Sequence, residues 1–160
     1  SYLPLGDLRL VCDHGDLGRG YRRTLDLAQG EATVRYRLGD ATYTRTMIAS
    51  HPDQVIAVHL TCNRPGLLRF EARLDSPLRA ASRVDGDALV LRGRAPSHVE
   101  PNYEDQRDPV QYADDRGLRF EARAVVTTDG RVDRGGDGLR VEAASRATLL
   151  IAMATDYVSA

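Results

Sequence analysis

Apolar residues recur at every second position along most of the chain, which is the pattern of β-strands that bury one face. The alternation is clearest in residues 31–38, 54–62 and 67–74. Further strands are predicted by the same period at residues 8–12, 21–27, 41–49, 88–92, 118–126, 138–143 and 147–154. Gly39-Asp40 reads as a two-residue hairpin turn. The pattern therefore predicts a single all-β domain with the architecture of an antiparallel β-sandwich.

Two parts of the sequence, about 50 residues apart, resemble each other. RFEAR occurs at 69–73 and again at 119–123, and RVDGDALVLRG at 83–93 parallels RVDRGGDGLRVEA at 131–143. We interpret the echo as one meander used twice, with an alternating strand, a polar turn and a short strand behind an Asp/Gly corner. Two stacked sheets, each receiving strands from both meanders, would accommodate such a duplication.

Charge gives no reason to expect a polyanionic partner. All 22 basic residues are arginine, which we attribute to the coding bias of a GC-rich genome, and the formal net charge is −1. The arginines are interleaved with Asp and Glu, so we expect no basic stripe, no nucleic-acid partner and no anionic membrane surface. No apolar run approaches the ~18 residues of a membrane span.

Metal and cofactor chemistry are not indicated. Cys12 and Cys62 stand 50 positions apart without partners at metal-ligand spacing. Both fall on faces that we interpret as inward, which favours two buried thiols, with a disulfide as the alternative. The four histidines lack the i,i+2 or i,i+4 spacing of a metal pair, and we read them as surface or turn residues; they are His14, His51, His59 and His98.

Acid–base and nucleophilic catalysis are equally unsupported. A general acid needs partial burial to raise its pKa. Glu71 and Glu121 instead lie between arginines on outward strand faces, where the neighbouring charges lower it. No G-x-S-x-G pattern is present, and most aspartates lie in turns beside Gly or Pro. We expect no catalytic residue and no cofactor.

Residues 94–117 form the one long irregular stretch, and such loops are often functional. Three prolines restrict its backbone, so we favour an ordered surface loop over a floppy one. His98 is the histidine of most interest, because Asn102 and Tyr103 lie close to it in the sequence.

Several segments, in order along nearly the whole chain, resemble family 95 glycoside hydrolases, which are α-L-fucosidases. They are 2–8 (YLPLGDL), 21–27 (YRRTLDL), 43–45 with 49–56 (YTR, ASHPDQVI), 74–77 (LDSP) and 154–157 (ATDY). The resemblance implies an antiparallel β-supersandwich with a galactose-mutarotase-like arrangement. It also implies that catalysis belongs to a separate (α/α)₆ barrel, which inverts the configuration while hydrolysing terminal α-linked L-fucose.

On this basis we expect residues 1–160 to be a fragment of a non-catalytic N-terminal scaffold domain, from a bacterial enzyme. Its partners would be the parent's own barrel and, through the parent, a fucosylated glycan. His98, Asn102 and Tyr103 are the expected contacts to the barrel or the sugar cleft. The family's domain begins some tens of residues earlier, which would leave a sheet edge unpaired and open to self-association.

Two alternatives stay open. The first is a stand-alone carbohydrate-binding module, although the chain has no Trp and few aromatic residues to form sugar platforms. The second is a structural interaction sandwich unrelated to glycans. The sequence does not indicate a compartment.

Overall fold

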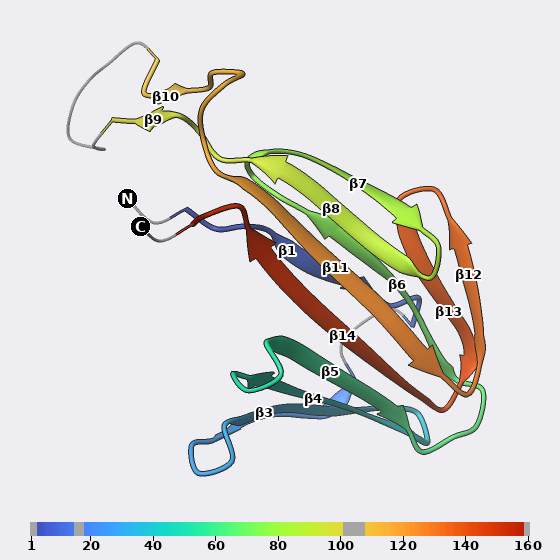
Figure 1. Ribbon diagram of the computed structural model, residues 1–160. Coiled ribbons are helices and arrows are strands. Elements are labelled where there is room, and N and C mark those ends of the chain that lie inside the picture. The colour runs from blue at the N-terminus through green and yellow to red at the C-terminus, as the bar shows by residue number, and fades with distance from the viewer. Residues whose placement is uncertain (1–2, 15–17, 101–107, 159–160) are drawn as a thin grey trace.

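The computed structural model describes residues 3–14, 18–100 and 108–158, and it places them in a sandwich of antiparallel strands (Figure 1). Fourteen strands lie in these residues: β1 (Asp7–Val11), β2 (Arg19–Asp26), β3 (Glu31–Leu38), β4 (Ala41–Ser50), β5 (Val55–Cys62), β6 (Leu68–Asp75), β7 (Arg79–Asp85), β8 (Ala88–Arg94), β9 (His98–Val99), β10 (Val110–Gln111), β11 (Arg119–Thr128), β12 (Arg131–Gly135), β13 (Gly138–Ala144) and β14 (Arg146–Thr155). The predicted all-β antiparallel sandwich is confirmed.

The two main sheets are unequal in size. The larger has eight strands in the order β2-β3-β4-β5-β14-β11-β8-β7, and the smaller has four in the order β1-β6-β13-β12. A separate two-stranded hairpin, β9–β10, extends from the body of the sandwich at the top of Figure 1. The smaller sheet therefore ends at β1, while the larger sheet continues through β4 and β3 to β2.

The internal repeat maps onto an exchange of strands between the sheets. In the first copy β6 lies in the smaller sheet and the hairpin β7–β8 in the larger one; in the second copy β11 lies in the larger sheet and β12–β13 in the smaller. Consequently β6 pairs with β13 and β11 pairs with β8, so each copy's first strand is bonded to the other copy's last. The prediction that each meander supplies strands to the sandwich is confirmed.

Four of the fourteen strands were not predicted from the sequence. The two-residue strands β9 and β10 lie in the stretch at 94–117 that was interpreted as an irregular loop, whereas the other two, β7 and β12, belong to the main sheets. Both are outer strands of their sheets, with one neighbour each. Their sequences, RAASRVD and RVDRG, are polar and exposed, which suits a sheet edge but hides the period of two. The ten predicted strands are all present, with ends that differ by at most two residues.

The core lies where the two copies of the repeat face each other. Its largest fully buried side chains are Phe70, Leu89, Leu91, Leu139, Leu149, Val90 and Val141. We call this region, made of β6, β8, β11, β13 and β14, the closed half. We call β2, β3 and β4 the wing. Its outer strand, β2, is exposed along its whole length.

Both cysteines are free, so the thiol interpretation is confirmed and the disulfide alternative is wrong. Cys62 is buried, whereas Cys12 is only partly so. Within the described ranges, no helix is long and apolar enough to cross a membrane.

Candidate functional site

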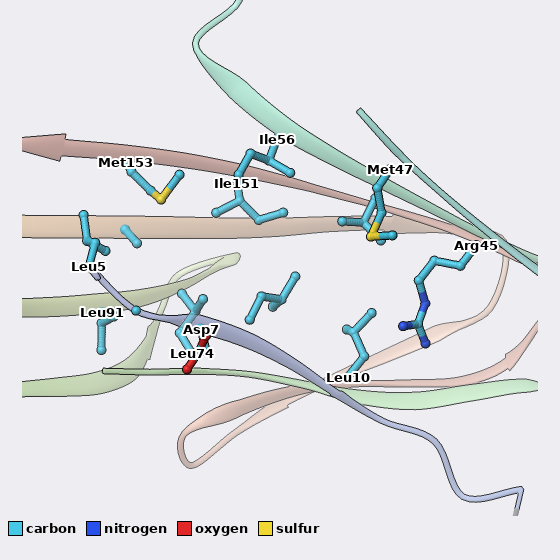
Figure 2. Close-up of a pocket in the computed structure, with 14 residues that line it drawn as sticks. Leu5, Asp7, Leu10, Arg45, Met47, Ile56, Leu74, Leu91, Ile151 and Met153 are labelled. Atoms are coloured by element: carbon cyan, nitrogen blue, oxygen red, sulfur yellow. The ribbon is translucent and has the colours of Figure 1, made fainter. Parts of the chain in front are cut away.

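An apolar groove of about 270 Å³ runs beneath the edge strand β1 (Figure 2). Its walls come from both sheets, and the side chains that define it are Leu5, Leu8 and Leu10 on the β1 side and Met47, Ile56, Ile151 and Met153 on the larger sheet. In Figure 2 Arg45 extends from β4 towards Leu10. The groove is open because, in the part of the chain that the structure describes, no strand continues the smaller sheet beyond β1 to cover the wing strands β2–β4.

A second hollow, of about 430 Å³, adjoins this groove and shares Leu10, Arg45 and Met47 with it. It is the more polar of the two, because Tyr21 and Arg23 of β2 contribute to its wall. No carboxylate is among the described residues that line it. We call the side of the sandwich that carries these two hollows the open side. It is apolar at the end of the groove and cationic at the end of the second hollow.

Three rings pack together at the cationic end. Tyr36 and Tyr43 stack with their centroids 5.3 Å apart, and His14 is tilted against both, at 5.4 and 4.8 Å. The Tyr36 hydroxyl and His14 Nε2 share a hydrogen bond of 2.7 Å. The predicted turn at Gly39-Asp40 fixes the register that sets Tyr36 opposite Tyr43. His14 was predicted as a surface or turn residue, and its place in this cluster, which depends on long-range folding, was missed.

Partial burial keeps the acidic groups of this cluster neutral. Loss of hydration raises the pKa of Tyr36 to about 12, and it also raises the pKa of Tyr43 and of the Cys12 thiol. A thiol held in its neutral form is a poor nucleophile. Two buried nitrogens, His14 Nδ1 and Arg45 Nε, have no hydrogen-bond partner among the described residues. The cluster is therefore suited to binding or packing, and not to nucleophilic catalysis.

In each copy of the repeat, one glutamate forms ion pairs with two arginines. Glu71 pairs with Arg73 at 2.8 Å and with Arg140 on β13 at 3.4 Å. Glu121 pairs with Arg123, its neighbour in β11, and with Arg92 on β8 at 2.5 Å.

Hydrogen bonds from these arginines lower the pKa of both glutamates, as predicted from the sequence. The pKa of Glu142 is lowered by Arg131, and that of Asp129 by the backbone amides of Ser145 and Arg146. Among the described residues, every carboxyl group with a displaced pKa is therefore held as a carboxylate, which is the opposite of what a general acid requires.

His98 lies at the start of the β9–β10 hairpin, half exposed, with its Nε2 2.9 Å from the carboxylate of Glu100. Strand pairing sets His98 opposite Gln111. Tyr112 attaches the hairpin to the sandwich, since its ring lies under the Arg79 guanidinium at 4.1 Å. Asn102 and Tyr103, the other two expected contact residues, lie outside the described residues.

No metal centre is present in the part of the chain that the structure describes, where His, Cys, Asp and Glu form no group of three with suitable geometry. His59 shares a 2.8 Å hydrogen bond with Thr148 on the outer face of the larger sheet, in agreement with its prediction as a surface residue.

Comparison with known proteins identifies the family. Residues 1–160 match the family model described as glycosyl hydrolase family 65, N-terminal domain. The chain is 33% identical over 167 residues to alpha-L-fucosidase 2 of Arabidopsis thaliana, and 25% identical over 162 residues to probable alpha-fucosidase A of Aspergillus oryzae (strain ATCC 42149 / RIB 40). Each alignment covers 98% of this chain but 20% of the relative's length. The chain belongs to the glycosyl hydrolase family 65 N-terminal domain family.

Proposed function

We propose that the chain is a non-catalytic scaffold domain of an α-L-fucosidase of the family 95 type. In this proposal the parent enzyme hydrolyses terminal α-linked L-fucose from glycans, with inversion, on a barrel domain outside these 160 residues. The observation that carries the proposal is that arginines form ion pairs with Glu71 and Glu121. These ion pairs keep both carboxyl groups of the repeat ionised. The names of the two relatives, and the 20% of their length that the chain matches, support the assignment to a larger fucosidase.

The open side of the sandwich is the surface on which we propose that the rest of the enzyme packs. It combines the apolar groove beneath β1 with exposed side chains of the wing, such as Tyr21. Burial of apolar surface is the main source of stability at interfaces between domains. When this side is uncovered, the free edge of β1 is open to pairing with a second copy of the chain.

We further propose that the β9–β10 hairpin contacts the catalytic barrel or the sugar cleft. The hairpin extends from the sandwich, and His98 is half exposed on it with its Nε2 in contact with the Glu100 carboxylate. Asn102 and Tyr103 belong to the connection between the two short strands and are proposed as neighbouring contacts. A contact that positions the barrel would act on substrate binding more than on folding.

Activity assays on two chain lengths test the scaffold function. The 160-residue chain and its longer native polypeptide are each incubated with a fucosylated oligosaccharide, and released L-fucose is followed by NMR. The expected result is no release by the short chain, and release of the inverted anomer by the long one. Fucose release by the short chain at enzymatic rates would overturn the proposal, as would a long chain that cleaves only other sugars.

Titration of the short chain with the same oligosaccharide separates the scaffold from a carbohydrate-binding module, since only the module is expected to bind it.

In the long chain, His98→Ala is expected to raise KM about tenfold without lowering the melting temperature. His59→Ala, which removes a histidine on the larger sheet instead of the hairpin, is the matched control and should leave KM unchanged.

Sedimentation of the short chain tests self-association through β1.

A further inference from the structure

Four arginines gather on the outer face of the wing, contrary to the prediction that no basic stripe forms. Arg19 lies directly opposite Arg37, and Arg22 lies directly opposite Arg35, in the pairing of β2 with β3. All four side chains are exposed. We call this set the arginine block. Its charge is local, because the chain as a whole has a formal net charge of −1.

A β-bulge brings the block together. In a regular strand, residues three apart point to opposite faces, so Arg19 and Arg22 would be separated. The register shifts between them, and Gly20 adopts a φ of +70° that other residues rarely accept. Gly18 packs against β3, where an added Cβ would lie only 1.5 Å from the Arg37 carbonyl oxygen. Two glycines thus shape the backbone that aligns four like charges.

The arginine block differs from the arginines of the closed half in having no acidic partner. Arg73, Arg92, Arg123 and Arg140 all form ion pairs with Glu71 or Glu121. Among the described residues, no carboxylate lies within ion-pair distance of any member of the block. Like charges directly opposite each other in a sheet repel, and a bound anion would relieve this repulsion.

The surroundings of the block favour a polar ligand. Thr42 lies opposite Arg37 and Thr44 opposite Arg35, and Thr61 follows Thr44 on the next strand. Stable protein–protein interfaces have apolar or aromatic side chains at their centre, and these rows contain none. Guanidinium groups bind carboxylates through paired hydrogen bonds, and threonine hydroxyls bind sugar hydroxyls.

We propose that the arginine block binds an acidic polysaccharide, through carboxylates of successive uronic acid residues. The choice of a carbohydrate rests on the proposed function, while the need for an anion rests on the charges alone. The site would hold a carbohydrate chain near the enzyme without taking part in its hydrolysis.

Affinity electrophoresis and calorimetry with polygalacturonate test this site on the 160-residue chain. The same polymer with its carboxyl groups methyl-esterified is the neutral control ligand. We expect binding to polygalacturonate that weakens as salt is raised, and no binding to the ester. The double variant Arg22→Gln/Arg35→Gln should lose at least about tenfold in affinity, the equivalent of one lost charge-assisted contact. It should unfold no more readily than the parent chain, because it removes repulsion.

The matched control is Arg92→Gln/Arg123→Gln, which removes the same charge from the closed half and should retain affinity. Arg22→Lys/Arg35→Lys keeps the charge but loses the planar fork, so an intermediate affinity is expected. Equal loss in both glutamine variants would overturn the site, as would equal binding to dextran sulfate or duplex DNA, or no binding at low salt. Because no hydrolysis is measured, failure here leaves the scaffold proposal standing, and failure of the fucose assay leaves this result standing.

Discussion

The closed half and the wing are built from similar strands, yet they meet their surroundings in different ways. In the closed half, glutamates lie across from arginines and the inner side chains are sealed between two sheets, so that Leu89 is 0% exposed. In the wing, arginines lie across from arginines, and Leu25, on the inner face of β2, is 64% exposed. The closed half satisfies its own charges and apolar surface, whereas the wing leaves both available to a partner.

This contrast follows from the number of strands in each sheet. Four strands cannot cover eight, so among the described residues the part of the larger sheet beyond β1 has no second layer. Edge strands in natural proteins are often protected by charged residues, and the arginines of β2 fit that role as well as a binding role. A comparison of matched substitutions in the two regions therefore tests whether the wing is a structural element or a contact surface.

The largest difference is expected from shortening one leucine in each region. Leu89→Ala should destabilise the chain by about 2–5 kcal/mol, because it removes a fully buried side chain and leaves a cavity. Leu25→Ala should change stability by less than about 0.5 kcal/mol, since that side chain is mostly in water. Urea unfolding at equilibrium measures both. Equal losses would mean that the wing is as well packed as the closed half.

A smaller effect is expected at the bulge that aligns the arginines. Gly20→Ala has room for the new methyl group, whose nearest neighbour would be Arg37 Nε at 3.8 Å, but it forces Ala to a φ of +70°. The strain should cost about 1 kcal/mol. Gly135→Ala on the edge strand β12, where a Cβ meets nothing within 4 Å, is the control and should be neutral or slightly stabilising. Thermal unfolding of the two variants distinguishes these outcomes, and equal melting temperatures would argue against a strained bulge.

The smallest effect concerns the ion pairs of the closed half. The pKa of Glu121 in the folded chain is below its ordinary value of 4.5, so its stabilising contribution is present above about pH 4.5 and is lost as the pH falls further. Since the pair is partly exposed, Glu121→Gln should cost at most about 1 kcal/mol at pH 7 and nothing at low pH. Melting temperatures at pH 7 and pH 3 measure the difference. Arg22→Gln in the wing should lower stability at neither pH.

Much of the fold was predictable because it depends on local signals. A period of two marked ten strands, and the turn at Gly39-Asp40 set the register that stacks Tyr36 on Tyr43. The lowered pKa of Glu71 was predictable too, because one of its arginine partners is two residues away in the same strand. The strands β7 and β12 were missed because edge strands need not alternate.

The site was less predictable, since its parts come together through long-range contacts. His14 reaches Tyr36 across 22 positions, and nothing in the residues around His14 indicates a ring partner. The same is true of Arg45, whose buried Nε depends on the position of β1 above β4. His98 was selected from the composition of its loop, and the structure adds Glu100 as its partner.

By itself the sequence determined that the chain forms strands, which side chains on most of them turn inward, and that its repeat glutamates stay ionised, because each of these follows from residues one or two positions apart. Only the tertiary structure decided which strands became neighbours. Pairing β2 with β3 through a bulge placed arginine against arginine, and pairing β6 with β13 placed glutamate against arginine. The charge of a surface patch depends on which residues lie opposite each other on neighbouring strands. Which strands become neighbours cannot be deduced from the spacing of residues along the chain.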